Sequence, residues 1–165
     1  MPVVVHLVRH AHAVSDEENP LRPLSPRGHD ECRRVAAFLK GNDAFAPSFW
    51  WYSSLVRARE TASALHAALT PRAQISETPD LLPEDSPARI VARLRTLPAH
   101  TCLALVGHEP HLSTLASILA CDRTALPVFA LKKAAIITLE RDDASFSGRS
   151  SWTVLWHLTP SLIPA

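Results

Sequence analysis

Residues 3–12 read VVVHLVRHAH, an apolar, β-branched run that stops at an arginine and a histidine. β-Branched residues favour strands, and a run without polar alternation is typical of a strand covered on both faces. Such strands occur in parallel sheets, which carry helices on both sides. The run therefore predicts a buried strand of an α/β domain, with Arg9 and His10 at its carboxyl end.

Helices and strands alternate along the rest of the chain. A helix is expected from Pro26 to just before Gly41, because Ser25 suits the N-cap, proline the first helical position and glycine the end. We expect further helices at 54–69, 90–97 and 112–119, and strands at 49–52, 74–77, 102–106, 134–139 and 153–158, with a turn-rich segment at 141–151. This order predicts one domain over residues 1–165, a three-layer α/β/α sandwich with a mostly parallel sheet.

The composition fits one soluble globular domain. The 165 residues are 47% hydrophobic, which is enough to build a core. Seventeen basic residues balance sixteen acidic ones, so no overall charge favours nucleic acid or an anionic membrane as a partner. No apolar run approaches the roughly 20 residues that a membrane-spanning helix needs.

The cysteines suggest a reducing compartment. Cys32, Cys102 and Cys121 are odd in number and form no close pair, which argues against a disulfide framework or a cysteine-based zinc site. Each has apolar neighbours in the sequence, so we expect all three to be small buried hydrophobic residues. The first residues also lack the basic segment and cleavage site of a secretory signal. We therefore expect a cytoplasmic protein.

Residues suited to phosphate chemistry follow three of the expected strands. Arg9 and His10 follow the first strand, Ser53 and Arg57 the second, and His108 the third core strand. Ligands of open α/β sheets bind at the carboxyl ends of the strands, so we expect these residues to share one crevice. Arginine forks suit phosphate oxygens, a neutral imidazole attacks phosphorus directly, and a second histidine stabilises charge on a non-bridging oxygen. The pattern indicates phosphoryl transfer.

Three segments stand in a recognisable order: Leu7-Val8-Arg9-His10-Ala11, Arg57 in an S-x-x-x-R-A-x-x-T setting, and Gly107-His108. In this order they resemble the histidine phosphatase superfamily. Within it, the short chain and the segment R-P-L-S-x-x-G at 22–28 are similar to the SixA-type phosphohistidine phosphatases. The resemblance implies that His10 is the nucleophile, that Arg9, Arg57 and His108 bind the phosphoryl group, and that Ser53 precedes the helix of Arg57. Ala11 stands where most members have glycine, although SixA-like members often carry alanine.

Five further residues keep alternative interpretations. The resemblance places Arg22 near the pocket, whereas its loop setting also fits a surface residue. Family phosphomonoesterases use a loop glutamate as general acid, and Glu84 is the nearest candidate, with Asp85 beside it; both also fit a solvated loop. Imidazole, with a reference pKa of about 6.5, leaves readily, so a phosphohistidine phosphatase works without a strong acid. The role of His12 is open. Arg59 is expected on a solvated helix face.

Nine histidines raise the hypothesis of a metal site, and His10-x-His12 does imitate a metallohydrolase strand motif. The barrels that carry that motif need roughly 250 residues, which this chain lacks. The arginine beside His10 also repels a cation. We therefore expect no metal and no cofactor, and we expect His111 to be a wall of the pocket.

The expected activity is metal-independent removal of a phosphoryl group through a phospho-His10 intermediate, with a phosphohistidine-bearing protein as substrate. One alternative is a phosphomonoesterase that acts on a small phosphorylated metabolite, with Glu84 as acid; the short chain leaves little room for the insertions that build such a pocket. Another is a non-catalytic phosphate-binding or adaptor domain. The joint presence of Arg9, His10, Arg57 and His108 argues against the adaptor. No nucleic-acid or membrane partner is expected.

Overall fold

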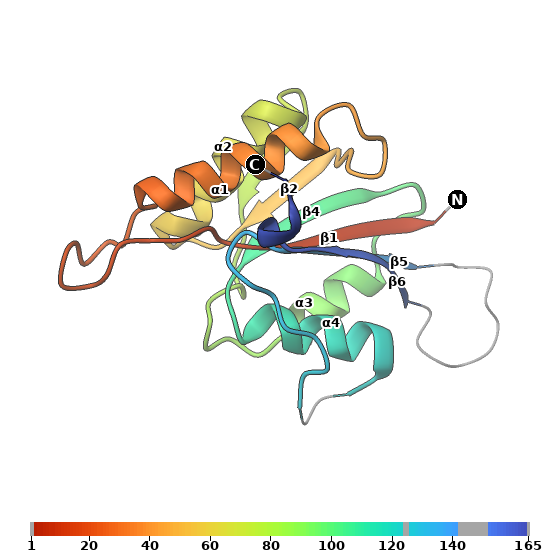
Figure 1. The fold of residues 1–165 in the computed structure, drawn as a ribbon. Helices are drawn as coiled ribbons and strands as arrows, with labels where there is room; N and C mark the ends of the chain where they lie inside the picture. The colour runs from red at the N-terminus through yellow and green to blue at the C-terminus, as the bar shows by residue number, and fades with distance from the viewer. Residues whose placement is uncertain (1, 124–125, 142–151, 165) are drawn as a thin grey trace.

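The computed structural model describes residues 2–123, 126–141 and 152–164, which form one sheet between two layers of helices (Figure 1). The strands are β1 (Val3–Arg9), β2 (Phe49–Tyr52), β3 (Gln74–Glu77), β4 (Cys102–Gly107), β5 (Ile136–Arg141) and β6 (Trp152–Leu158). The helices are α1 (Pro26–Leu39), α2 (Val56–Leu69), α3 (Ala88–Arg95) and α4 (His111–Cys121), followed by the 3-10 turn Pro160–Leu162.

The six strands lie in the order β3-β2-β4-β1-β5-β6. The first four run parallel, whereas β5 is antiparallel to β1 and β6 is antiparallel to β5. The expected α/β fold with a mostly parallel sheet is therefore confirmed. Because β1 lies between β4 and β5 near the middle of the sheet, its carboxyl end is enclosed by loops from both halves of the chain.

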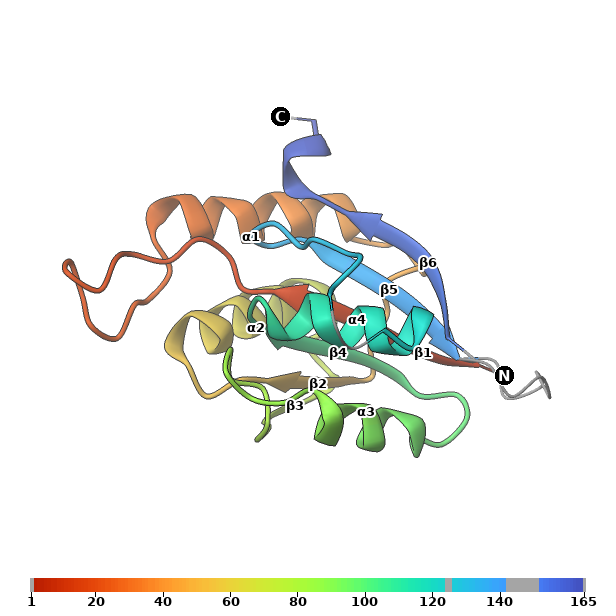
Figure 2. The same cartoon turned by 90° about the horizontal axis from the view of Figure 1, so that it is seen from below.

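Two helices cover each face of the sheet (Figure 2). Leu7 points into the core under α3 and α4, and its neighbour Val8 points into the core under α1 and α2. Both side chains are fully buried, which explains why β1 lacks polar alternation. Burial of a side chain of this size contributes roughly 1.5–3 kcal/mol, so the two cores fix the strand that carries the site. Within the described residues, no helix is both long and apolar enough to cross a membrane.

The expected boundaries are close to the observed ones, and the two short strands at 49–52 and 74–77 match. The boundary difference that matters most for the site is at β5, which begins at Ile136 rather than at residue 134. Ala134 has a left-handed φ of 55°, and the N–H of Ala135 donates to the carbonyl of Lys132 at 3.0 Å, so a turn precedes the strand. Of the turn-rich segment expected at 141–151, residues 142–151 lie outside the described residues.

The cysteine expectation is wrong in part. Cys32 is buried on the inner face of α1, and burial raises the pKa of its thiol to about 12. Cys102 is only half-buried, and Cys121 is exposed. Cys121 is the last residue of α4, where the helix has moved past the core, so its apolar neighbours in the sequence do not cover it. All three thiols are free.

Candidate active site

The predicted site residues meet at one edge of the sheet, where parallel strands bring their carboxyl ends together. Arg9 is the last residue of β1, Ser53 follows β2 and His108 follows β4. Arg57 lies in the first turn of α2. The ring centroids of His10 and His108 are 5.0 Å apart, so the ends of β1 and β4 place the two imidazoles side by side.

His10 has a defined tautomer. Its Nδ1 lies 2.7 Å from the carbonyl oxygen of Ala11. A carbonyl only accepts, so Nδ1 carries the proton and Nε2 carries the lone pair. The side chain is 4% exposed, and burial, reinforced by the charge of Lys133, lowers the pKa of His10 to about 2. The imidazole is therefore neutral at ordinary pH, with Nε2 available as a nucleophile.

The ring of His108 has a different hydrogen-bond arrangement from that of His10. Its Nε2 lies 2.8 Å from the hydroxyl of Ser53. Burial first, and then the charge of Arg57, lower its pKa to about 3, so this ring is also neutral. Among the described residues, its buried Nδ1 has no hydrogen-bond partner. If the Ser53 hydroxyl donates to Nε2, Nδ1 carries the proton and can donate it to an oxygen in the pocket.

The two arginines also keep unused donors. Arg9 donates from Nη1 to the carbonyl of Leu131 at 2.7 Å. The Nε atoms of Arg9 and Arg57 are buried without a partner among the described residues. Burial lowers the pKa of both guanidinium groups, while the carboxylate of Glu109 opposes this effect at Arg9. Buried donors are normally satisfied, so these N–H groups are arranged for an anion that enters the site.

Lys133 is a site residue that sequence analysis missed. Its Nζ lies 3.4 Å from Nε2 of His10, on the loop that precedes β5. The amino end of an antiparallel strand lies at the same edge as the carboxyl ends of its parallel neighbours, so this loop reaches the pocket. In the sequence, Lys132 and Lys133 are alike, and a sheet of parallel strands would place site residues after each strand, whereas Lys133 precedes one.

Comparison with known proteins agrees with this geometry. Residues 5–82 match the family model described as the histidine phosphatase superfamily (branch 1), a span that holds Arg9, His10 and Arg57. This stretch, just under half of the chain, is similar to the histidine phosphatase superfamily. No curated protein matches it by sequence.

Solved structures share the fold of this chain over nearly its whole length. A protein histidine phosphatase SixA complexed with tungstate has a TM-score of 0.82 at 24% identity, covering 96% of this chain and 98% of its own. A SixA protein from Agrobacterium tumefaciens has a TM-score of 0.75 at 21% identity, covering 97% and 99%. An alpha-ribazole phosphatase from Shigella flexneri has a TM-score of 0.72 at 14% identity, covering 92% and 94%.

Thr61 joins two segments of the pocket, the loop after His10 and the first turn of α2. Its hydroxyl donates to the carbonyl of Arg57 at 2.7 Å and accepts from the backbone N–H of Ala11 at 3.0 Å. The loop after His10 is thereby tied to the first turn of α2. These two hydrogen bonds give a physical reason for a threonine four residues after Arg57.

His12 has a supporting place in the loop. Its Nδ1 lies 2.7 Å from the hydroxyl of Ser25, and its backbone N–H donates to Glu31 at 2.8 Å. The Ser25 hydroxyl also accepts from the N–H of Gly28, as expected of the N-cap of α1. These bonds fasten the loop after the nucleophile to the amino end of α1.

We expect Gly28→Ala to destabilise the protein strongly, because a Cβ at position 28 would overlap the backbone carbonyl of His12. Overpacking of this kind costs about 1–3 kcal/mol, which corresponds to a fall in Tm of roughly 2–12 °C for a chain of this length. Activity should fall as well, since the loop after His10 must shift. Gly41→Ala is the comparison without overlap: that glycine has open space around it, so alanine there meets only the strain of the positive φ of 75° and leaves the loop after His10 in place. An unchanged Tm for Gly28→Ala would contradict the prediction.

The remaining candidates lie at the rim. Arg22 has a φ of 49° and donates from Nε to the carbonyl of Val14 at 3.1 Å, within 3.2 Å of Asp16. Its charge lowers the pKa of Arg57, so the two guanidinium groups lie within electrostatic range of each other. Glu84 is exposed, and its carboxylate acts on the same arginine in the opposite sense.

Asp85 has a structural task in its loop. Its carboxylate accepts from the N–H of Leu82 at 2.8 Å, which closes the turn that holds Glu84.

His111, expected as a wall of the pocket, is 2% exposed near His108, and burial lowers the pKa of its ring. Arg59 is exposed on α2, as expected. No group of three or more histidine, cysteine or acidic side chains with metal-binding geometry occurs in the described ranges.

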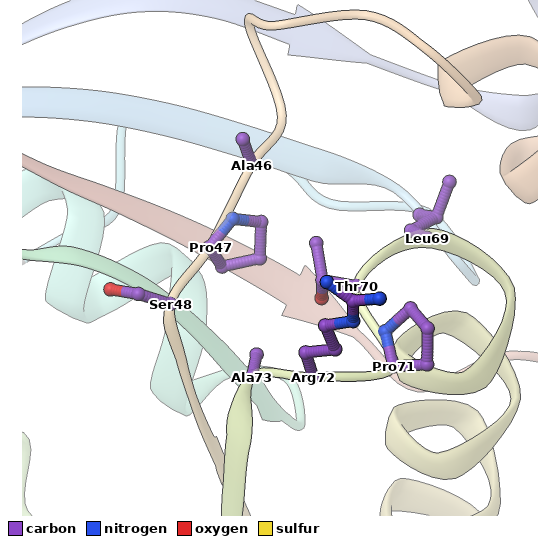
Figure 3. A pocket seen from close by; sticks show the side chains of 8 residues that line it. All are labelled: Ala46, Pro47, Ser48, Leu69, Thr70, Pro71, Arg72 and Ala73. Atoms are coloured by element: carbon purple, nitrogen blue, oxygen red, sulfur yellow. The ribbon is translucent and has the colours of Figure 1, made fainter.

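A second hollow lies at the opposite edge of the sheet (Figure 3). It has a volume of about 510 Å³ and is lined by residues 46–48, before β2, and 69–73, before β3. Its lining is mostly apolar, with Arg72 as the single charged side chain. Phosphate recognition needs several convergent donors, which the edge with His10 provides and this hollow does not.

Proposed function

We propose that this protein is a metal-independent phosphatase that forms a phospho-His10 intermediate, and that its substrate is phosphohistidine on a protein, as in the SixA type. One observation carries the proposal. The lone pair of His10 Nε2 faces a pocket in which buried donors of Arg9, Arg57 and His108 have no partner among the described residues. A nucleophile and an unfilled set of anion ligands together suit phosphoryl transfer.

In the first step, the Nε2 lone pair of His10 attacks phosphorus, and the bond from phosphorus to the substrate nitrogen breaks. Arg9, Arg57 and His108 hold the equatorial oxygens while charge redistributes over them. The proton on Nδ1 of His10 stays there and is donated in a hydrogen bond to the Ala11 carbonyl, which stabilises the positive charge that the ring gains. The substrate imidazole leaves with the bonding pair and takes a proton from water.

In the second step, water attacks the phosphorus of phospho-His10. The bond from phosphorus to Nε2 breaks, and His10 leaves as the neutral imidazole from which it started. One proton of the attacking water is released, and inorganic phosphate departs. Because the pKa of His10 is about 2 in its buried setting, the freed ring stays unprotonated and ready for the next cycle.

Two observations favour phosphohistidine over an ester. The side chain of Glu84 is exposed to solvent, and the carboxylate of Asp85 is committed to its turn. An imidazole leaving group needs little help from an acid, unlike an alkoxide. The loop between β3 and α3 is also short, at 78–87, which leaves the site accessible to a phosphohistidine on a protein surface. The three free thiols fit a cytoplasmic location.

The deciding experiment compares three substrates: a phosphohistidine protein, a phosphoserine peptide and a small alkyl phosphate. We expect the phosphohistidine substrate to have the highest kcat/KM. A preference for the alkyl phosphate would favour the phosphomonoesterase, for which the structural likeness to an alpha-ribazole phosphatase is the supporting observation. Binding of phosphate without turnover of any substrate would favour the adaptor.

We expect activity to survive chelation by EDTA, because the pocket offers arginines and a lysine where a metal site offers anionic ligands. Tungstate should inhibit competitively by occupying the oxygen sites of the phosphoryl group. The measurement is the initial rate on an aryl phosphate with EDTA, with tungstate, and with zinc or magnesium restored. Loss of activity in EDTA that either metal reverses would contradict metal independence.

A further inference from the structure

We propose that Lys133 is a fourth ligand of the phosphoryl oxygens, and that its ammonium moves from the lone pair of His10 Nε2 to the phosphoryl group when substrate binds. The inference rests on the proposed function and adds a residue and a charge change to it.

The contact between Lys133 and His10 has a defined direction. Nζ lies 3.4 Å from Nε2, and Nδ1 of the same ring holds the proton. The ammonium therefore donates and Nε2 accepts. A phosphorus atom bonded to Nε2 would take the position that this hydrogen bond now uses, so the ammonium must leave the lone pair and meet the oxygens beside it.

The backbone of Lys133 is fixed against the strand of the nucleophile. The N–H of Ala134 donates to the carbonyl of His10 at 3.3 Å, and the N–H of Arg9 donates to the carbonyl of Ala135 at 3.0 Å. The side chain of Arg9 adds its bond to the carbonyl of Leu131. Three bonds thus hold the loop 131–135 to Arg9 and His10, and only the side chain of Lys133 has to move.

The electrostatic setting of Lys133 also favours an anion. Burial, then the charges of Arg9, Arg22 and Arg57, lower the pKa of the ammonium to about 8. Of the groups facing it, the carboxylate of Glu31 acts the other way. Several cations around one buried space repel one another, and a phosphoryl dianion relieves that repulsion.

The position of Lys133 does not allow it to act as a general acid toward the leaving group. In an in-line displacement, the leaving nitrogen lies on the far side of phosphorus from His10 Nε2, out of reach of a group that contacts Nε2. In the second step, Nε2 is itself the leaving atom, and its lone pair returns as the bond to phosphorus breaks. Lys133 can then donate to that lone pair again, without transferring its proton.

The test compares Lys133→Met with Lys132→Met, which removes the same charge from the exposed neighbour. We expect Lys133→Met to weaken tungstate binding, measured by calorimetry, by roughly 10–100-fold, the effect of losing one charged hydrogen bond. The kcat/KM for an aryl phosphate should fall by a similar factor. Lys132→Met should change both quantities less than twofold. Circular dichroism checks the folding of each variant, and Lys133→Gln serves as a second variant if methionine disturbs it.

The pH profile gives an independent measurement. The ammonium binds oxygens only when protonated, so tungstate affinity and kcat/KM should fall as pH rises through about 8. The arginines stay charged there, and His10 and His108 stay neutral because their pKa values are about 2 and 3. The fall should disappear in Lys133→Met. Lys133→Arg should bind tungstate with an affinity that does not fall as pH rises through about 8.

Equal tungstate affinity in Lys133→Met and Lys132→Met, or an alkaline fall that persists in Lys133→Met, would overturn the proposal. The failure of the proposed function looks different. A protein that hydrolyses no phosphate but loses tungstate affinity on Lys133→Met would keep Lys133 as an anion ligand and lose the phosphatase.

Discussion

His10→Ala should lower phosphate hydrolysis by roughly 10⁴-fold or more while the protein stays folded, as expected when a covalent nucleophile is removed. The backbone bonds at this position do not need the side chain. The N–H of His10 donates to the carbonyl of Gly107 at 3.0 Å, and its carbonyl accepts from Ala134. The ring bonds to the adjacent residue Ala11 and, at 3.4 Å, to Nζ of Lys133, so its loss removes one hydrogen bond to a distant residue.

The measurement has two parts. Initial rates on phosphohistidine and on an aryl phosphate give the loss of turnover, and rapid quenching with labelled substrate detects phosphoenzyme. The label should be stable in alkali and labile in acid, as phosphohistidine is, and absent from His10→Ala. His29→Ala, at an exposed position on α1, is the matched control. Residual activity above a few per cent in a folded variant would remove His10 from the role of nucleophile.

Glu84→Gln should slow hydrolysis of an alkyl phosphate by roughly 100- to 10,000-fold and hardly affect phosphohistidine. The structure gives Glu84 a position from which its charge reaches Arg57, in a turn closed by Asp85. An alcohol leaving group needs a proton in the first step, whereas imidazole leaves without one. If no other acid serves esters, the two substrates should therefore separate in this variant.

Burst kinetics identifies the affected step, because only the formation of phospho-His10 expels the leaving group. Asp85→Asn is the comparison, since it disturbs the turn but leaves the carboxylate of Glu84. Equal losses on both substrates in Glu84→Gln would indicate a structural role. No loss on either would make Glu84 a solvated loop residue.

The sequence predicts the fold and the strand-end residues because both follow from local patterns. The β-branched run before Arg9 and the N-cap Ser25 are visible within a few residues. The position of Lys133 depends on β5 running antiparallel beside β1, a long-range pairing that no local pattern encodes. The exposure of Cys121 likewise depends on where α4 passes the core.

The sequence also gives no information on the tautomer of His10, since it depends on one hydrogen bond in the folded loop. The sequence can nominate a nucleophilic residue but does not say which of its two nitrogens reacts. The structure selects Nε2 because Nδ1 faces the carbonyl of Ala11. The same holds for His108, whose Nε2 faces Ser53.

The hydrogen bond from His10 to the Ala11 carbonyl affects which substitutions position 11 can tolerate in evolution. In many enzymes, a second side chain selects the reactive nitrogen of a histidine, and a single codon change can remove that partner. Here the partner is a peptide oxygen, which every amino acid supplies. Position 11 can therefore vary in evolution between glycine and alanine without changing which nitrogen attacks. The choice of reactive atom is protected from point mutation at that position, and the constraints that remain there are the space around the side chain and the N–H that donates to Thr61.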